Sequence, residues 1–345
     1  MTSRRLRVGF VGWPAHPVFL EAAGADPALE VVRMPLDADP AEVLAFLQGC
    51  DGYYTMAARD DLPAAYHLGE ELLAKLPNLL LAVSYGAGFD TVDVPACTRA
   101  GVGVVAQVGG NANGVAEHAL GMMLTLFKRI PQAQAALRAG TLASREDFLG
   151  RELAGRTVGL IGLGHVGMRV ARLLGAFGCP VLAFDPLLDE ATCAGRGARK
   201  VDLPTLLAQS DVVSLHCPLN ATTRGMIGAE AFAMMRPGAL FVTTARGWIH
   251  DEAALLAALD SGHLAGAGLD VWEREPPRAG YALLDHPCVI ASPHTAGVTE
   301  ESRSRVARMA AEAFSALAAG EVPPRLVDPS VAETLMRRRA EILGG

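Results

Sequence analysis

The chain has 345 residues, of which 51% are hydrophobic and 19% charged, and its formal net charge is −7. This apolar content is enough for sizeable cores and excludes a disordered chain, and the length suggests about two domains. The negative charge argues against a nucleic-acid-binding surface, which needs clustered Lys and Arg, so we expect no nucleic-acid partner.

The N-terminal residues and the cysteines bear on the cellular compartment. The start of the chain shows no continuous apolar segment of a secretory signal, and the apolar stretch 119–127 is too short to span a bilayer. None of the six cysteines forms a C-x-x-C pair, and no His/Cys cluster has zinc spacing. We therefore expect a cytoplasmic protein with reduced thiols, no bound metal and no membrane contact.

The first third of the chain alternates strand-like and helix-like segments. Helical patterns cover 40–48 and 64–76. The β-rich runs are 6–12, 29–34, 51–56, 79–85 and 102–108. Strands that alternate with helices predict a parallel sheet covered on both faces.

A long apolar helix is predicted at about 113–130, and the more polar segment 131–153 is predicted to be a connection. The helix has more apolar side chains than one side of a monomer needs, which favours a homodimer through this helix. These side chains are Val115, Ala119, Met122, Met123, Leu126 and Phe127.

A second alternating series fills most of the remaining chain. Strands are predicted at 157–162, 180–185, 211–216, 239–245, 266–271 and 288–292, and helices at 166–177, 202–209, 229–235, 251–260 and about 299–319. The charged run from Arg337 to Arg339 is interpreted as a solvated helix face. The chain is therefore predicted to be an α/β protein with two doubly wound parallel-sheet domains and an active site in the cleft between them.

A glycine-rich motif predicts the cofactor. Gly162, Gly164 and Gly167 form G-x-G-x-x-G between a predicted strand and a predicted helix. Such glycines allow a tight turn, close approach of a pyrophosphate and close helix packing, while the helix N-terminus binds the phosphates. Asp185 ends the next strand, at nearly the spacing of about 20 residues that is typical of the motif. A carboxylate there binds the adenosine ribose and repels a 2′-phosphate, so the motif predicts NAD rather than NADP.

Three further segments carry a family resemblance. They read SYGAGFDTVD (84–93), TTARGWIHDEAALLAALDSGHLAGAGLDVWEREPP (243–277) and SPHTAG (292–297). Together with NGVAEHALGMML (113–124), they resemble the D-isomer-specific 2-hydroxyacid dehydrogenase family. The resemblance implies a flavodoxin-like substrate-binding (catalytic) domain formed by 1–110 and 299–345, and a Rossmann NAD-binding domain at 111–298. It also points to a homodimer.

The resemblance implies a catalytic Arg, Glu and His at Arg246, Glu275 and His294. These residue types suit the interconversion of a 2-keto acid and a D-2-hydroxy acid. Arg246 can bind the substrate carboxylate and polarise the carbonyl oxygen. His294 can protonate that oxygen during reduction by NADH. Glu275 can hydrogen-bond the other imidazole nitrogen and stabilise the protonated ring.

Other contacts are implied by position in the same motifs. The backbone amides of Ala87 and Gly88 are implied to hold the substrate carboxylate, because glycine-rich turns can bind anions. The implied cofactor contacts are His165 and Val166 at the pyrophosphate, Cys217 at the adenosine, Thr244 and Ala245 at the nicotinamide, Asp270 at its carboxamide, and Gly297 after the catalytic His.

Departures from the family pattern bear on the substrate. Met56 and Ser84 stand near positions where phosphoglycerate dehydrogenases of similar pattern place Arg, which favours a small, non-phosphorylated substrate. Two alternatives stay open. One is an NAD-sensing protein similar to the family's corepressors, which can also retain the three catalytic residues. The other is a formate dehydrogenase, although there the partner of the His is usually Gln rather than an acid such as Glu275.

Overall fold

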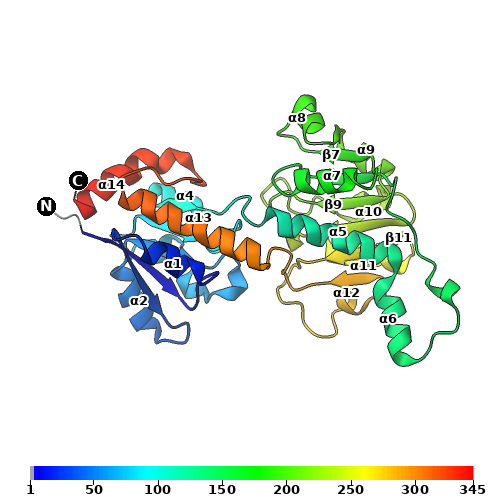
Figure 1. Cartoon of the computed structure of the whole chain (residues 1–345), viewed down its shortest axis with the longest axis horizontal. Coiled ribbons are helices and arrows are strands. Elements are labelled where there is room, and N and C mark those ends of the chain that lie inside the picture. Colours follow the sequence, from blue (N-terminus) through cyan, green and yellow to red (C-terminus); the bar gives the residue numbers. More distant parts are fainter. Residues whose placement is uncertain (1–3, 345) are drawn as a thin grey trace. The chain divides into compact units, whose positions relative to one another are not determined.

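The computed structural model describes residues 4–344, which form two compact units. Unit 1 comprises the residues up to Asn111 and those from Val298 onward, and unit 2 is Ala112–Gly297. Figure 1 labels helices of both units and some strands of unit 2. All pairings between the named strands are parallel, which confirms the predicted α/β fold with two parallel sheets.

Unit 1 contains a five-stranded sheet in the order β2-β1-β3-β4-β5, the flavodoxin-like order that was predicted. Its strands are β1 (Leu6–Val11), β2 (Leu29–Met34), β3 (Gly52–Thr55), β4 (Leu81–Ser84) and β5 (Gly103–Val105). Its helices are α1 (Val18–Gly24), α2 (Pro40–Gln48), α3 (Glu70–Leu73), α4 (Val94–Arg99), α13 (Glu300–Ala318) and α14 (Ala332–Leu343).

The core of unit 1 joins the two ends of the chain. Figure 1 shows α13 beside α1, and Phe314 of α13 lies edge-on to both Phe19 of α1 and Tyr54 of β3. Phe19 in turn stacks on Tyr54 with ring centroids 4.1 Å apart. Since all three rings are buried, α13 completes the core of a sheet whose strands all come from the N-terminal third of the chain.

Two expectations for unit 1 were wrong. The segment 64–76 is not one helix, because only a 3-10 turn at Ala64–Tyr66 and the short α3 form there. The run Arg337–Arg339 is not simply a solvated face. Arg338 donates hydrogen bonds to the carbonyls of Leu79, Gly101 and Pro77, and Arg339 donates to those of Leu317 and Ala318. Both guanidinium groups therefore bind α14 to the rest of unit 1 by satisfying backbone acceptors.

Unit 2 contains a seven-stranded sheet in the order β12-β11-β10-β9-β6-β7-β8. Its strands are β6 (Val158–Ile161), β7 (Val181–Phe184), β8 (Arg199–Lys200), β9 (Val212–Leu215), β10 (Ala239–Thr243), β11 (Leu264–Leu269) and β12 (Val289–Ala291). Its helices are α5 (Ala112–Lys128), α6 (Ile130–Ala139), α7 (Gly167–Gly175), α8 (Glu190–Gly195), α9 (Leu203–Gln209), α10 (Ala229–Met234), α11 (Glu252–Asp260) and α12 (Ala282–Asp285).

Two hydrophobic cores cover the sheet of unit 2. One contains side chains of α5, α7 and α8, and the other contains side chains of α9, α10, α11 and α12. Buried strands such as β9 and β10 contribute to both cores. Apolar material on both faces of a parallel sheet is the arrangement that its near-continuous apolar strands predict.

The expectations for residues 113–153 need correction. The apolar side chains of α5 are not in excess, because five of the six expected ones are buried, four of them in a core of unit 2, and Leu126 packs against the same core. The segment 131–153 is not a plain connection, since it contains most of α6 and a 3-10 turn at Arg145–Phe148. Pro131 lies beyond the end of α5 and stands in the first turn of α6, where proline is tolerated.

Within residues 4–344, no helix is both long and apolar enough to cross a membrane. All six cysteines carry free thiols.

Candidate active site

The predicted site residues of unit 2 gather at one edge of its sheet. In a parallel sheet the carboxyl ends of all strands lie on the same side. The glycine motif follows β6, and β6 lies between β7 and β9, where the strand order reverses. The other residues follow their strands in the same way: Asp185 after β7, Cys217 after β9, Thr244, Ala245 and Arg246 after β10, Asp270 after β11, and His294 and Gly297 after β12. Ligands of doubly wound sheets bind at such a reversal point.

The glycine loop has the geometry that its motif predicts. Gly162 has φ +92°, a conformation that favours glycine, and a Cβ there would lie 2.7 Å from the amide nitrogen of Cys217. A Cβ at Gly167 would lie 2.2 Å from the carbonyl oxygen of Gly162, so the helix start needs glycine to pack on the loop. Nothing lies within 4 Å of a Cβ built at Gly164, and His165 beside it is exposed. The first turn of α7 can thus receive a phosphate.

Asp185 lies against this loop. Its Oδ2 accepts a hydrogen bond from the Leu163 amide at 2.9 Å, and its Oδ1 accepts one from the Leu187 amide at 3.0 Å. The carboxylate is therefore held beside the glycine loop, as binding of an adenosine ribose requires. Arg196, which the sequence reasoning missed, also lies here, because its Nη1 donates to the Leu163 carbonyl at 2.5 Å.

The loop after β10 contains a buried hydroxyl, that of Thr244. Within residues 4–344, the hydroxyl oxygen of Thr244 has no hydrogen-bond partner, although its residue is buried. A buried hydroxyl without a partner is costly and is suited to a polar group of a ligand. With the glycine loop and Asp185, it makes the residues of unit 2 fit a dinucleotide such as NAD.

Glu275 and His294 form a close pair of ionisable groups in the candidate site. His294 Nδ1 lies 2.6 Å from Glu275 Oε2, while Glu275 Oε1 accepts a hydrogen bond from the Trp272 amide at 3.1 Å. Burial by itself would lower the pKa of His294, but the hydrogen bond and the negative charge of Glu275 outweigh it, so the pKa is raised. Burial would raise the pKa of Glu275, but the contact with His294 outweighs it and the pKa is lowered. The pair therefore favours an imidazolium beside a carboxylate.

Arg246 is near this pair. It stands in the loop after β10, just before the 3-10 turn Gly247–Ile249, and its Nη1 donates to the carbonyl of Ala245 at 2.7 Å. Its positive charge contributes to lowering the pKa values of both Glu275 and His294. The three residues implied by the sequence are thus within electrostatic reach of one another.

Asp270 holds the backbone around His294. His294 has φ +53°, which a non-glycine residue rarely adopts. The Asp270 carboxylate accepts hydrogen bonds from the Ser292 hydroxyl and from the amides of Thr295 and Ala296, at 2.6 to 3.0 Å. The Asp270 carbonyl also accepts the His294 amide at 2.7 Å. These bonds support the unusual conformation, a role that the sequence reasoning did not assign to Asp270. Its contact with a carboxamide stays a prediction.

Ala87 and Gly88 belong to unit 1, in the loop after β4. Within residues 4–344 their amides have no hydrogen-bond acceptor, whereas the Ser84 hydroxyl donates to the carbonyl of Gly88. The Gly86 carbonyl accepts the Gln107 amide at 2.8 Å, which holds the loop from the other side. Two adjacent amides without acceptors suit an anion such as a carboxylate.

The two positions that bear on a phosphorylated substrate are buried. Met56 is apolar, and a Cβ built at Gly12 would lie 3.0 Å from its terminal methyl group. Ser84 is fully buried and uses its hydroxyl within the Ala87–Gly88 loop. Neither position presents a cation for a phosphate.

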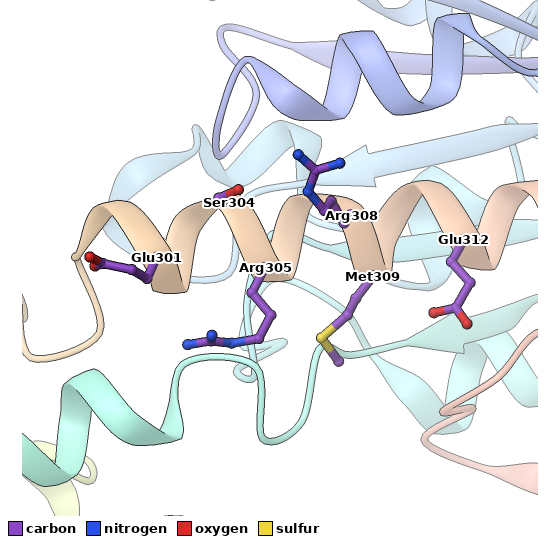
Figure 2. A pocket seen from close by; sticks show the side chains of 6 residues that line it. All are labelled: Glu301, Ser304, Arg305, Arg308, Met309 and Glu312. Carbon is purple, nitrogen blue, oxygen red and sulfur yellow. The ribbon is translucent and has the colours of Figure 1, made fainter.

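A hollow of about 600 Å³ lies elsewhere, on α13 of unit 1. Its lining residues are Glu301, Ser304, Arg305, Arg308, Met309 and Glu312. Figure 2 shows Arg305 and Met309 on one side of the helix and Arg308 pointing away from them. Arg305 already donates to the carbonyl of Gly110 at 2.6 Å. None of the predicted site residues lines this hollow.

Several residues of the candidate site escaped the sequence reasoning. His118 of α5 lies 2.9 Å from the Ser292 hydroxyl, and the Trp272 indole nitrogen donates to the Ser292 carbonyl at 3.1 Å. All three stand inside segments that carried the resemblance. Their presence there was the only available signal, because their contacts join parts of the chain that are far apart in sequence.

Comparisons with known proteins show which family the chain resembles. The family model "D-isomer specific 2-hydroxyacid dehydrogenase, NAD binding domain" matches residues 120–296. The D-3-phosphoglycerate dehydrogenase of Archaeoglobus fulgidus is 40% identical over 250 residues, which are 72% of this chain and 47% of that protein. The chain spans about half the length of the curated relatives it matches.

Solved structures resemble almost the whole chain. A glyoxylate reductase from Paecilomyes thermophila has a TM-score of 0.84 and 29% identity, covering 94% of this chain and 98% of that one. A D-lactate dehydrogenase from Aquifex aeolicus, complexed with NAD and lactic acid, has a TM-score of 0.78 and 30% identity, covering 91% and 96%.

Removing the charge of Glu275 should lower the pKa of His294. Glu275→Gln keeps the shape but not the negative charge, so the imidazole should lose its proton at a lower pH than in the wild type. The measurement is an NMR titration of the histidine ring signals, with His294→Gln used for assignment. Glu230→Gln, a change in an exposed glutamate of the same unit, should leave the His294 titration unchanged. Equal His294 midpoints in wild type and Glu275→Gln would show that the two residues are not a charge pair.

Proposed function

Because the chain belongs to the D-isomer specific 2-hydroxyacid dehydrogenase family, we propose that it reduces a small, non-phosphorylated 2-keto acid to a D-2-hydroxy acid with NADH, and catalyses the reverse oxidation with NAD. The observation that carries the proposal is the 2.6 Å contact between Glu275 and His294, with Arg246 close enough to affect both. We propose that unit 2, which contains the NAD-binding domain, holds the cofactor, and that unit 1 is the substrate-binding domain.

The side chains have separable tasks in this reaction. Arg246 binds the substrate carboxylate and polarises the adjacent carbonyl, and the amides of Ala87 and Gly88 bind the same carboxylate. His294 uses Nδ1 for Glu275, so Nε2 is the nitrogen that gives its proton to the carbonyl oxygen. Glu275 keeps the ring oriented and protonated until transfer. The nicotinamide, when bound, supplies the hydride in reduction and takes it in oxidation.

The cofactor residues divide along the sheet edge. Gly162, Gly164 and Gly167, with His165 and Val166, would bind the pyrophosphate. Asp185 and Cys217 would face the adenosine half of the cofactor. Thr244, Ala245, Asp270 and Gly297 would surround the nicotinamide half. The orphaned Thr244 hydroxyl supports this last assignment.

The substrate proposal rests on Met56 and Ser84, which offer no cation. A phosphate monoester carries about two negative charges at neutral pH, and an Arg or Lys at these positions would favour its binding. Because relatives are named as D-3-phosphoglycerate dehydrogenases, every test of the substrate must include D-3-phosphoglycerate as the alternative substrate.

The proposal predicts NADH oxidation by at least one of glyoxylate, hydroxypyruvate, pyruvate and phenylpyruvate, and little NAD reduction with D-3-phosphoglycerate. His294→Ala should lower kcat/KM by roughly 10²–10⁴-fold, because it removes the proton donor. Arg246→Ala should raise KM and lower kcat, since the guanidinium binds both substrate and transition state. Arg199→Ala, at an exposed arginine on β8, is the matched control. No turnover with any keto acid, or preferred turnover of D-3-phosphoglycerate, would contradict the proposal.

The cofactor preference follows from Asp185. Its carboxylate should repel the 2′-phosphate of NADPH, and like charges brought together cost enough for at least about a tenfold preference in kcat/KM for NADH. Asp185→Ser should narrow the preference. Arg196→Ala should not lower kcat/KM for NADH more than kcat/KM for NADPH, because within residues 4–344 its Nη1 donates to the backbone carbonyl of Leu163. Equal kcat/KM values for the two cofactors in the wild type would show that Asp185 does not set the preference.

We also propose a homodimer, which the family resemblance implies. The buried side chains of α5 cannot form its interface, but α6 and the segment after it carry exposed apolar side chains: Ile130, Leu137, Leu142 and Leu149. Sedimentation at micromolar concentration should show a dimer. Leu137→Lys should shift it toward monomer, whereas Leu187→Lys, at a side chain that is 91% exposed outside this segment, should not. A monomeric wild-type protein would rule the dimer out.

A further inference from the structure

A buried acid that the reaction does not use lies beside the Glu275–His294 pair. Glu252 is the first residue of α11, and only 4% of it is exposed. Its Oε1 accepts the Glu273 amide at 2.7 Å, and its Oε2 accepts the hydroxyl of Tyr281. The Glu252 amide donates back to Oε1 of Glu273 at 3.3 Å. Both carboxylate oxygens of Glu252 are therefore used inside the protein.

The surroundings of Glu252 make an acid costly at this position. Burial raises its pKa and outweighs the hydrogen bonds from Tyr281 and from the Glu273 amide, while the charges of Glu273 and Glu275 raise the pKa further. Asp251 precedes Glu252 as the N-cap of α11. The positive charge of Arg278 acts on the Tyr281 phenol and lowers its pKa, against the larger effects that raise it. A buried acid in an acidic neighbourhood contributes little to stability unless the hydrogen bonds that it accepts fix a particular part of the structure.

Those hydrogen bonds act on the turn that carries Glu275. The Trp272 amide donates to Glu275 Oε1 and closes the turn Trp272–Glu275, while the Glu273 amide inside it points at Glu252. The Trp272 ring lies edge-on to the Tyr281 ring with centroids 6.4 Å apart. We call Glu252, Trp272 and Tyr281 the Glu252 clamp, because Glu252 and Tyr281 contact the turn that begins at Trp272.

The clamp also connects the turn to the other two catalytic candidates. The Trp272 indole donates to the carbonyl of Ser292, two residues before His294. A Cβ on Gly247, the residue after Arg246, would lie 2.0 Å from the carbonyl carbon of Trp272, so the two backbones are in direct contact. A shift of the turn would therefore move Glu275 relative to both His294 and Arg246.

We propose that Glu252 is a positioning residue, which holds the Trp272–Glu275 turn through the Glu273 amide and Tyr281 and so keeps Glu275 Oε2 against His294 Nδ1. The inference deepens the proposed function and rests on it. Without the Glu252 carboxylate, the Glu273 amide and the Tyr281 hydroxyl lose their acceptor in a partly buried site, and the turn relaxes to satisfy them. The Glu275–His294 contact then lengthens and the imidazolium loses stabilisation.

The test reads the His294 titration by NMR, so it does not depend on turnover. Glu252→Ala should lower the midpoint of His294 relative to the wild type. Glu252→Gln should restore it, because the amide oxygen still accepts the Glu273 amide although the charge is gone. Tyr281→Phe keeps the ring against Trp272 but removes the hydroxyl, and it should lower the midpoint by less than Glu252→Ala. Glu230→Ala, at an exposed glutamate in the first turn of α10, should change nothing.

Two results would overturn the proposal. An unchanged midpoint in Glu252→Ala would show that the turn does not depend on Glu252. Equal lowering in Glu252→Ala and Glu252→Gln would show that only the charge of Glu252 acts on His294. If Glu252→Ala does not fold, Tyr281→Phe provides the test. An unchanged His294 midpoint in Tyr281→Phe would then show that the clamp does not position Glu275.

Kinetics separates this inference from the proposed function. In the keto-acid assay, Glu252→Ala should lose about 10- to 100-fold in kcat/KM, as expected for a misplaced catalytic group, and activity should decline at a lower pH than in the wild type. Its KM for NADH should stay unchanged, and Glu252→Gln should recover most of the activity. If no keto acid is turned over by the wild type but the His294 midpoints shift as expected, the proposed function fails and the positioning role stands.

Discussion

The parallel direction of the seven strands in unit 2 is the constraint on which the candidate site depends. It places the carboxyl ends of β6, β7, β9, β10, β11 and β12 on one edge, so that loops from residue 162 to residue 297 share one surface. The reversal of strand order beside β6 puts the glycine loop near the middle of that edge. Residues more than 100 positions apart can therefore act in one site, with the cofactor loop on one side and His294 on the other.

At this edge, competing electrostatic effects decide the state of His294. Burial favours the neutral imidazole, whereas the short hydrogen bond to Glu275 and its charge favour the imidazolium, and the second effect is larger. The backbone of His294 is also held in an unusual conformation by Asp270, whose carboxylate meets three donors. The same principle applies to Glu275 and Asp270. A buried carboxylate is tolerated when its oxygens accept hydrogen bonds, and it then holds the donor groups in place.

The failures of the sequence predictions have physical reasons. The apolar pattern of α5 predicts an excess of apolar surface, because periodicity shows which face is apolar but not how much protein covers it. The charge run predicts solvent-exposed side chains at Arg338 and Arg339, because it does not reveal backbone carbonyls within reach of long side chains. The segment 64–76 has apolar spacing typical of a helix but forms only short pieces, because local propensity is weak where tertiary packing competes.

The sequence by itself determined the alternation of strands and helices and the glycine motif with Asp185, and its family resemblance implied Arg246, Glu275 and His294 as catalytic residues. These features are local, since they depend on periodicity, on the conformations that glycine allows, and on short motifs that span neighbouring residues. Only the tertiary structure decided that Asp270 supports the His294 backbone, that His118 reaches Ser292, and that Glu252 holds the turn carrying Glu275. The physical reason is that each of these contacts joins residues from different strand-end loops or helices. The distances between these residues are set by the order in which strands pair in the sheet rather than by any spacing along the chain.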